Sequence, residues 1–258
     1  MKIREIKVNS ILGKSSIGDY CINPYVGCMH ACIYCYADYY TKKNFKHLEE
    51  WGEFVDVKIN APEVLLKEIV KKKKGAVYIS SLTDAYQPLE AKYGITRRIL
   101  EILARYDWPV IIQTKSSLIL RDLDILKKFS NVEVGFTIIS LDEEKSRKLE
   151  KFASSPKERV EALRILKENG IKTFVFIGPI MPFTRIEEIE KIVKETKKFV
   201  DEFYFDRLNL KPGLVEKLRK IEELRKVDFS SLSFFYEDLK KQIFELTKKE
   251  DVKSDILF

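Results

Sequence analysis

Short apolar stretches rich in β-branched and aromatic residues alternate along the chain with longer segments whose apolar residues recur every three or four positions. The first pattern predicts buried strands, and the second predicts amphipathic helices. We expect six strands, at residues 22–26, 76–81, 110–114, 132–138, 173–178 and 202–208. The expected helices are one that begins near Thr96 and others at 118–129, 157–169, 185–200, 214–226 and 236–249.

This alternation predicts an α/β fold with parallel strands, because a strand, a helix and a second strand in succession form a right-handed crossover unit. Six such units fall short of the eight that close a barrel, so we expect a partial (β/α)6 TIM-like barrel. Residues 1–209 would form the barrel domain, and residues 210–258 would form a helical C-terminal extension packed on it. Functional groups in such folds gather at the carboxyl ends of the strands.

Three of the four cysteines lie within eight residues, directly after the first expected strand. Cys28, Cys32 and Cys35 are separated by three and then two residues. Thiolates select zinc, copper(I) or iron–sulfur clusters. Disulfide pairing among the three clustered cysteines would leave one thiol unpaired. Structural zinc takes four protein ligands, and only Cys21 or His30 could supply the fourth. A cubane cluster held by three cysteines would instead leave one iron open to a reactant.

Composition agrees with an enzyme built on one sizeable core, since 45% of the 258 residues are hydrophobic. The net charge of +7 permits nucleic-acid binding, but runs such as Lys71–Lys74 and Lys240–Lys241 are typical of solvated helix faces. The N-terminal segment MKIREIKVNS has no apolar signal core, and no stretch approaches the ~20 apolar residues of a membrane span. We therefore expect a cytoplasmic protein with no membrane partner.

The cysteine spacing, with an aromatic residue before the third cysteine, resembles the cluster loop of the radical S-adenosylmethionine (SAM) enzymes. Other segments resemble one branch of that superfamily, the spore-photoproduct-lyase-like proteins, often labelled DNA repair photolyases. The matching segments are NPYVGCMHACIYCYA (23–37), VDVKINAPE (55–63), SLTDAYQPLE (81–90), YGITRRIL (93–100), TKS (114–116), Arg121 with Asp122, and GPIMP (178–182).

The resemblance implies that Cys28, Cys32 and Cys35 bind a [4Fe–4S] cluster whose open iron binds SAM. It also implies reductive cleavage of SAM to methionine and a 5′-deoxyadenosyl radical that abstracts hydrogen from a substrate, with a reductant such as ferredoxin or flavodoxin as partner. The branch suggests nucleic acid as the substrate and a lyase reaction. Spore photoproduct lyase, however, uses a further cysteine downstream of the loop, and here the only spare thiol is Cys21, upstream of it.

Residues at the ends of later strands are candidates for binding SAM. Asp84, assisted by Thr83, could accept a hydrogen bond from the SAM amino group, and Lys115 could pair with the carboxylate. The alternatives are that Asp84 caps a turn or helix and that Lys115 points to solvent. Thr137 and Ser140 are candidates for the ribose hydroxyls, and the candidates near the adenine are Tyr34, Gly178 and Pro179.

Tyrosines are numerous around the cysteine loop, and some are candidates for catalysis. Tyr36 and Tyr86 could act as stacking surfaces or radical relays, and Cys21 could supply a hydrogen atom; the alternative is core tyrosines with bonded hydroxyls. His30 could tune the cluster through a hydrogen bond to sulfur. Two other classes of function stay open at this point: a zinc-stabilised nucleic-acid-binding module and an iron–sulfur electron carrier.

Overall fold

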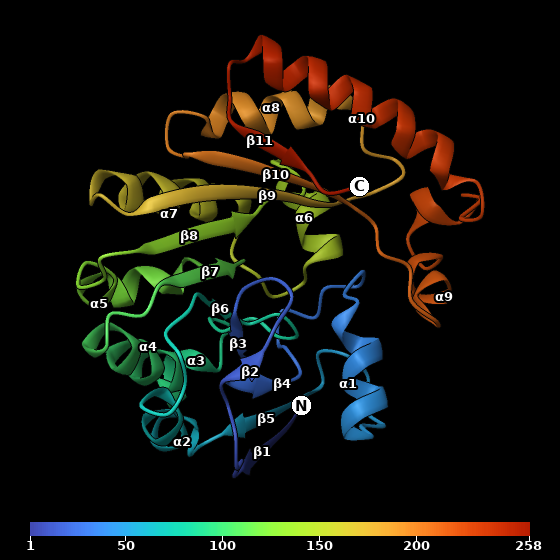
Figure 1. Ribbon diagram of the computed structural model, residues 1–258. Coiled ribbons are helices and arrows are strands. Elements are labelled where there is room, and N and C mark those ends of the chain that lie inside the picture. Colours follow the sequence, from blue (N-terminus) through green and yellow to red (C-terminus); the bar gives the residue numbers. More distant parts are fainter.

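Six parallel strands lie side by side in one sheet of the computed structural model, which describes residues 1–258, and the last five of them lie where strands were expected. Neighbouring strands are parallel and follow chain order, which confirms the partial barrel (Figure 1). They are β3 (Tyr20–Ile22), β6 (Val77–Ile79), β7 (Val110–Thr114), β8 (Val132–Thr137), β9 (Lys172–Ile180) and β10 (Glu202–Arg207).

Two short strands that the sequence pattern did not predict extend this sheet at its edges. At one edge β2 (Gly13–Lys14) pairs antiparallel with β3, and at the other β11 (Ser254–Ile256) pairs parallel with β10. The chain after residue 209 therefore contributes a strand as well as the helices α9 (Leu214–Leu218) and α10 (Leu232–Lys249). The proposed division of the chain at this residue stays a prediction.

The first expected strand is divided in two, and the prediction of one strand at 22–26 is wrong. Only β3 belongs to the large sheet, whereas β4 (Tyr25–Val26) pairs antiparallel with β5 (Phe54–Lys58). Pro24 lies between them, and proline has no backbone N–H to continue a ladder. The parallel pair of β5 with β1 (Lys2–Ile6) completes a small second sheet. The cysteine loop therefore follows β4 rather than a strand of the barrel.

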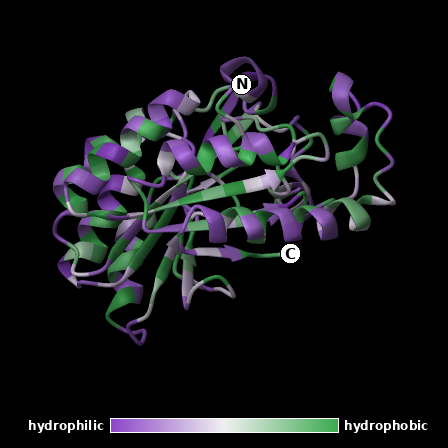
Figure 2. Ribbon diagram, turned by 90° about the horizontal axis from the view of Figure 1, so that it is seen from above, coloured by the Kyte–Doolittle hydropathy of each residue, from purple (hydrophilic) through white to green (hydrophobic).

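Amphipathic helices cover the outer face of the large sheet. Apolar residues on one side of α4 (Ile95–Arg105) and α7 (Pro156–Glu168) are buried, and a capping box formed by Ser155 and Glu158 begins α7. Apolar residues line most of the strands, while the helices carry both polar and apolar faces (Figure 2). The chain also forms the helices α3 (Glu90–Tyr93), α8 (Ile186–Thr196) and α2 (Ala61–Ile69), the last of which packs against α4. No helix combines the length and apolar character that a membrane span requires.

Several helix predictions differ from the structure. The segment expected as one helix at 118–129 is a 3-10 turn at Ser117–Asp122 followed by α5 (Leu123–Leu126), and the side chain of Asp122 at their junction is buried. Residues 141–156, where no strand or helix was expected, contain α6 (Glu143–Leu149), which Asp142 caps. Residues 214–226 form α9 and a 3-10 turn at Glu222–Leu224, and α1 (Ala37–Phe45) follows the cysteine loop unpredicted.

The inner face of the barrel is more polar than the face that packs on the helices. Tyr78, Gln113 and Thr137 project from successive strands and form a chain of hydrogen bonds. The Tyr78 hydroxyl donates to Gln113 Oε1 at 2.6 Å, and Gln113 Nε2 donates to Thr137 Oγ1 at 2.9 Å. Because these bonds cross β6, β7 and β8, they leave a fixed polar wall beneath the cysteine loop.

Candidate functional site

A cavity of about 290 Å³ lies between the cysteine loop and the carboxyl ends of the strands. It brings together most of the residues that the sequence singled out: Cys28, Cys32, Tyr34, Cys35, Tyr36, Thr83, Asp84, Lys115, Thr137, Gly178 and Pro179. Tyr86, Ser140 and Cys21 are not among its lining residues. Residues that the sequence analysis did not single out also line it, including Tyr78, Gln113 and Asp206.

The three thiols of the loop lie close enough to influence one another's ionisation. Cys28 and Cys32 are buried, and Cys35 is half-buried. Burial and the neighbouring Cys28 raise the pKa of Cys35 to about 12, and burial raises that of Cys32 well above its usual value. A cationic group bound among the three thiols would favour their thiolate forms and so lower these pKa values.

The donor set suits a cluster better than a single ion. No group of three or more His, Cys, Asp or Glu side chains converges on a site for one metal ion. Three soft thiols around a shared cavity match an iron–sulfur cluster with an open position. Two buried polar atoms of the cavity wall, Trp51 Nε1 and Ser80 Oγ, have no hydrogen-bond partner in the protein. The cavity therefore offers both soft ligands and groups for a polar molecule.

The conformation of the cysteine loop depends on close backbone contacts. Gly27 adopts a φ of +84°, and a Cβ there would lie 2.5 Å from the carbonyl oxygen of Phe54. The Thr83 hydroxyl donates to the carbonyl of Gly27 at 2.6 Å, and Gln87 Oε1 accepts from the backbone N–H of Met29 at 2.8 Å. The segment after β6 thus braces the start of the loop, and Thr83 uses its hydroxyl proton for that bond.

Asp84 connects the loop to the end of β7. Its Oδ1 accepts hydrogen bonds from Tyr86 N at 2.9 Å and Thr114 Oγ1 at 2.7 Å, and its Oδ2 accepts from Lys115 N at 2.9 Å. The Nδ1 atom of the buried His30 lies 3.3 Å from Oδ2. Burial alone would raise the pKa of Asp84, but the charges and hydrogen bonds around it hold that pKa well below its usual range. The bond from Tyr86 N agrees with the turn-capping alternative.

Replacing Asp84 with Asn is expected to destabilise the fold by roughly 2 kcal/mol at pH 7, because the amide cannot accept all the bonds of the carboxylate. A carboxyl group with a lowered pKa contributes stability that is fully present above its unfolded-state pKa, about 3.9, and is lost as the pH falls toward the folded-state pKa. Urea denaturation at pH 7 and pH 3 should therefore show a smaller difference in the free energy of unfolding between wild type and Asp84→Asn at pH 3 than at pH 7. An equal difference at both pH values would contradict this account.

Lys115 points into the cavity, so the alternative of a solvent-facing side chain is wrong. Its Nζ lies 6.0 Å from the ring centroid of Tyr34. Burial lowers the pKa of Lys115, but the nearby Cys32, Glu150 and Asp84 together raise it by more than burial lowers it. The amine therefore stays charged. A fixed positive charge at this place can bind a carboxylate.

A buried ion pair that the sequence analysis missed lies behind Tyr34. Glu150 and Arg159 are each 1% exposed, and Arg159 Nη2 lies 2.5 Å from Glu150 Oε2. The Tyr34 hydroxyl donates to the other oxygen of Glu150, and Arg159 Nη1 donates to the carbonyl of Thr137 at 2.8 Å. The pair thus joins the cysteine loop to the end of β8. The sequence signal for this pair is the position of Arg159 on the apolar face of α7, where Ala162 and Leu166 are also buried.

Two of the residues outside the cavity have other roles in the fold. Tyr86 is fully buried, and its hydroxyl donates to Asp122 at 3.1 Å. Arg121 also pairs with Asp122, so the matched segments around these residues form an ionic network away from the cavity. The Ser140 hydroxyl accepts from Asp142 N at 3.1 Å and caps the turn before α6. The structure therefore brings neither Tyr86 nor Ser140 to the cavity.

Cys21 and Tyr36 both contact Ser81. Cys21 lies within β3, where its thiol donates to Ser81 Oγ at 3.2 Å. The Tyr36 hydroxyl donates to the carbonyl of Ser81 at 2.6 Å, and burial with the neighbouring Cys35 raises the pKa of Tyr36 to about 12. Tyr36 thus lines the cavity and Cys21 lies beside it.

Gly178 and Pro179 lie inside β9, which continues to Ile180, so the expectation that they end the strand is wrong. A Cβ on Gly178 would lie 2.4 Å from the ring of Phe176, which faces the same cavity. The glycine therefore makes room for an aromatic side chain of the cavity wall.

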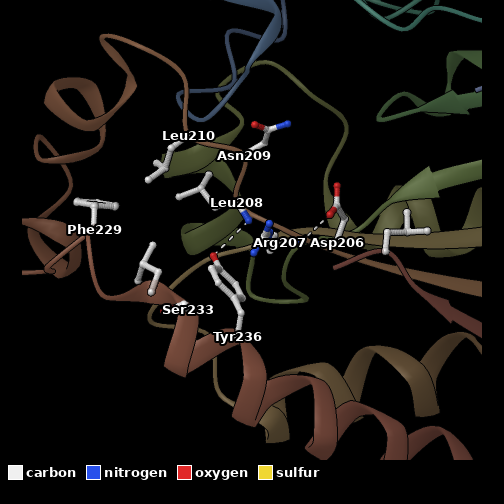
Figure 3. Close-up of a pocket in the computed structure, with 10 residues that line it drawn as sticks. Asp206, Arg207, Leu208, Asn209, Leu210, Phe229, Ser233 and Tyr236 are labelled. Atoms are coloured by element: carbon white, nitrogen blue, oxygen red, sulfur yellow. Dashed lines mark hydrogen bonds between the residues drawn. The ribbon is translucent and has the colours of Figure 1, made fainter. Parts of the chain in front are cut away.

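A second cavity of about 560 Å³ adjoins the first and shares Asp206, Arg207, Asn209 and Leu257 with it. Figure 3 shows Leu208 and Leu210 on the side of Phe229 and Asp206 on the opposite side, with Ser233 and Tyr236 of α10 below them. The Tyr236 hydroxyl accepts from Leu208 N at 3.2 Å and donates to the carbonyl of Ile180 at 2.9 Å, which fixes α10 to the ends of β9 and β10. Burial raises the pKa of Asp206. The combined cavity is polar at the strand ends and apolar toward the C-terminal segment.

Comparison with known proteins adds family evidence to this geometry. The model of the radical SAM superfamily matches residues 22–196. An uncharacterised protein of Methanocaldococcus jannaschii is 40% identical over 82% of this chain and 79% of its own length. A radical SAM Nα-GlyT isomerase of Pseudomonas phage M6 is 23% identical over 76% of this chain and 42% of its own length.

The fold also resembles that of solved structures. A variant of spore photoproduct lyase with bound SAM and a dinucleoside spore photoproduct aligns over 99% of this chain and 81% of its own, with a TM-score of 0.75 and 13% identity. The chain belongs to the radical SAM superfamily, whose enzymes use a [4Fe–4S] cluster and SAM.

Proposed function

We propose that Cys28, Cys32 and Cys35 bind the cluster of this enzyme and that SAM occupies the 290 Å³ cavity beside them. The observation that carries the proposal is that three thiols, the charged Lys115 and two unpartnered polar atoms all line one cavity. When bound and reduced, the cluster supplies the electron that cleaves SAM to methionine and the radical that abstracts hydrogen from substrate.

Residues of the cavity wall hold and orient SAM in this proposal. The Lys115 ammonium pairs with the SAM carboxylate, while Asp84 keeps Lys115 and His30 in place through its own bonds. Thr137 takes a ribose hydroxyl at the end of the polar wall, and the backbone at Gly178 and Pro179 lies against the adenine. Tyr36 and Cys21, which meet at Ser81, are the candidates for hydrogen transfer to the substrate.

We propose a nucleic acid as the substrate, bound in the second cavity. Arg207 lines both cavities, is exposed and forms no ion pair, so its guanidinium can bind a phosphate. Phe229 and neighbouring leucines offer an apolar surface for a base. The dinucleoside photoproduct bound by the lyase of similar fold supports this class of substrate. A lyase-type reaction, a cytoplasmic location and a ferredoxin or flavodoxin reductant belong to the same proposal.

The substrate proposal is tested with deuterated single-stranded oligonucleotides and the reconstituted enzyme. Deuterium is expected in 5′-deoxyadenosine, and Arg207→Ala should weaken oligonucleotide binding about tenfold and reduce the slope of log Kd against log salt by about one. Arg207→Lys keeps the charge and should keep the slope. SAM cleavage without deuterium transfer, together with unchanged binding by Arg207→Ala, would contradict a nucleic-acid substrate.

A further inference from the structure

The cysteine loop has a second face, turned away from the SAM cavity. Cys32, Cys35 and Trp51 line the inner cavity and also an outer groove of about 470 Å³. Cys35 further lines a groove of about 300 Å³ between α1 and residues 211–217. Any group held by these thiols therefore has the SAM cavity on one side and two surface grooves on the other.

The outer grooves are strongly basic. Seven lysines line them against three carboxylates, an excess of four charges in a chain whose net charge is +7. We call these lysines the basic rim. They are Lys42, Lys43, Lys211 and Lys217 in the smaller groove, and Lys148, Lys151 and Lys220, again with Lys217, in the larger one.

Part of the basic rim is free of carboxylate partners. Lys217 and Lys42 pair with Asp38, and Lys148 pairs with Glu144. In contrast, Lys43 and Lys211 lie over the rings of Tyr39 and Tyr40 at 5.9 and 5.4 Å. Lys151 lies over the ring of Phe152, which is 50% exposed, and Lys220 forms no ion pair. The grooves therefore present unneutralised positive charge beside exposed aromatic surface.

We propose that the basic rim is the docking surface of an acidic one-electron donor protein, an inference that rests on the proposed cluster ligands. Electron transfer slows steeply with distance, and Cys35 is where the proposed cluster site comes nearest to this surface. One electron passes from the reduced donor, which is oxidised by one electron, to the cluster, which is reduced by one, and no atom moves. Substrate must instead reach the inner cavity, so the rim favours a donor over nucleic acid.

The test uses the reconstituted enzyme and an acidic plant-type [2Fe–2S] ferredoxin. In Lys43→Glu/Lys211→Glu, the Kd for oxidised ferredoxin should rise at least about tenfold at low salt, and the rate of ferredoxin oxidation should fall similarly. Both effects should shrink as added salt screens the charges. Lys151→Glu/Lys220→Glu, on the larger groove, should behave in the same way.

The matched control is Lys71→Glu/Lys73→Glu, which makes the same change in net charge before β6, at the amino ends of the strands. Its ferredoxin Kd should equal that of the wild type. Cleavage of SAM with dithionite, a small reductant, should be unchanged in all variants; its absence in the wild type would overturn the proposed function instead. Equal ferredoxin binding by rim variants and wild type would overturn the docking proposal, as would a loss of oligonucleotide binding alone.

Discussion

Cys32→Ala is expected to lower the iron content of anaerobically reconstituted protein from about four per chain to less than about one, with loss of the brown colour. Cys32 is buried between the inner cavity and the outer groove, so no neighbouring thiol can replace it. Cleavage of SAM in the presence of dithionite should fall to background, because a two-thiolate site does not hold a cubane cluster. Iron analysis, absorption spectra and quantified 5′-deoxyadenosine measure the three effects.

Cys21→Ala is the matched control for the cluster measurement. It also removes a buried thiol, but one that lies in β3 and contacts Ser81 rather than lining the cavity. Its iron content should stay near four per chain. A full cluster in Cys32→Ala, or loss of the cluster in Cys21→Ala, would show that the ligands are wrongly assigned.

The barrel strands and the cysteine loop were predictable because their signals are local. Runs such as Val110–Thr114 are apolar and β-branched enough to predict buried strands, and three cysteines in eight residues indicate a metal site without any tertiary information. The strand β1 gave no such signal, because four of its five residues are exposed and its pairing with β5 crosses about fifty residues. The residues of β4 fell within the strand predicted at 22–26, but periodicity could not show that they pair with β5 in a separate sheet.

The charge distribution and the role of Asp84 depend on tertiary contacts. The lysines of the basic rim come from segments near residues 42, 150 and 215. Because these segments are far apart in the sequence, the sequence alone indicates only dispersed surface charge. Asp84 follows a strand end, as expected for a ligand-binding residue, but its partners come from the cysteine loop and β7. Sequence position could identify it as a site residue without showing that protein donors already surround it.

Arg159→Leu is expected to destabilise the protein by about 3–5 kcal/mol, because it leaves the carboxylate of Glu150 buried without its counter-charge. For a chain of this size, the loss corresponds to a fall in Tm of roughly 10 °C. Arg164, on the same helix, is the control: its pairs with Glu161 and Glu168 lie at the surface, so Arg164→Leu should destabilise the protein far less than Arg159→Leu does. Urea denaturation measures both.

The double variant Glu150→Leu/Arg159→Leu decides what the buried pair does. Removing both charges should recover most of the stability lost in Arg159→Leu, since an apolar pair of similar volume can replace a buried ion pair at little cost. The Ile33 N–H still donates to the Leu149 carbonyl at 3.0 Å, so the loop keeps a second attachment and the cluster should be retained. If the double variant were instead less stable than Arg159→Leu by the full loss that Glu150→Leu causes alone, the two residues would act independently, and the loop would depend on each of them separately.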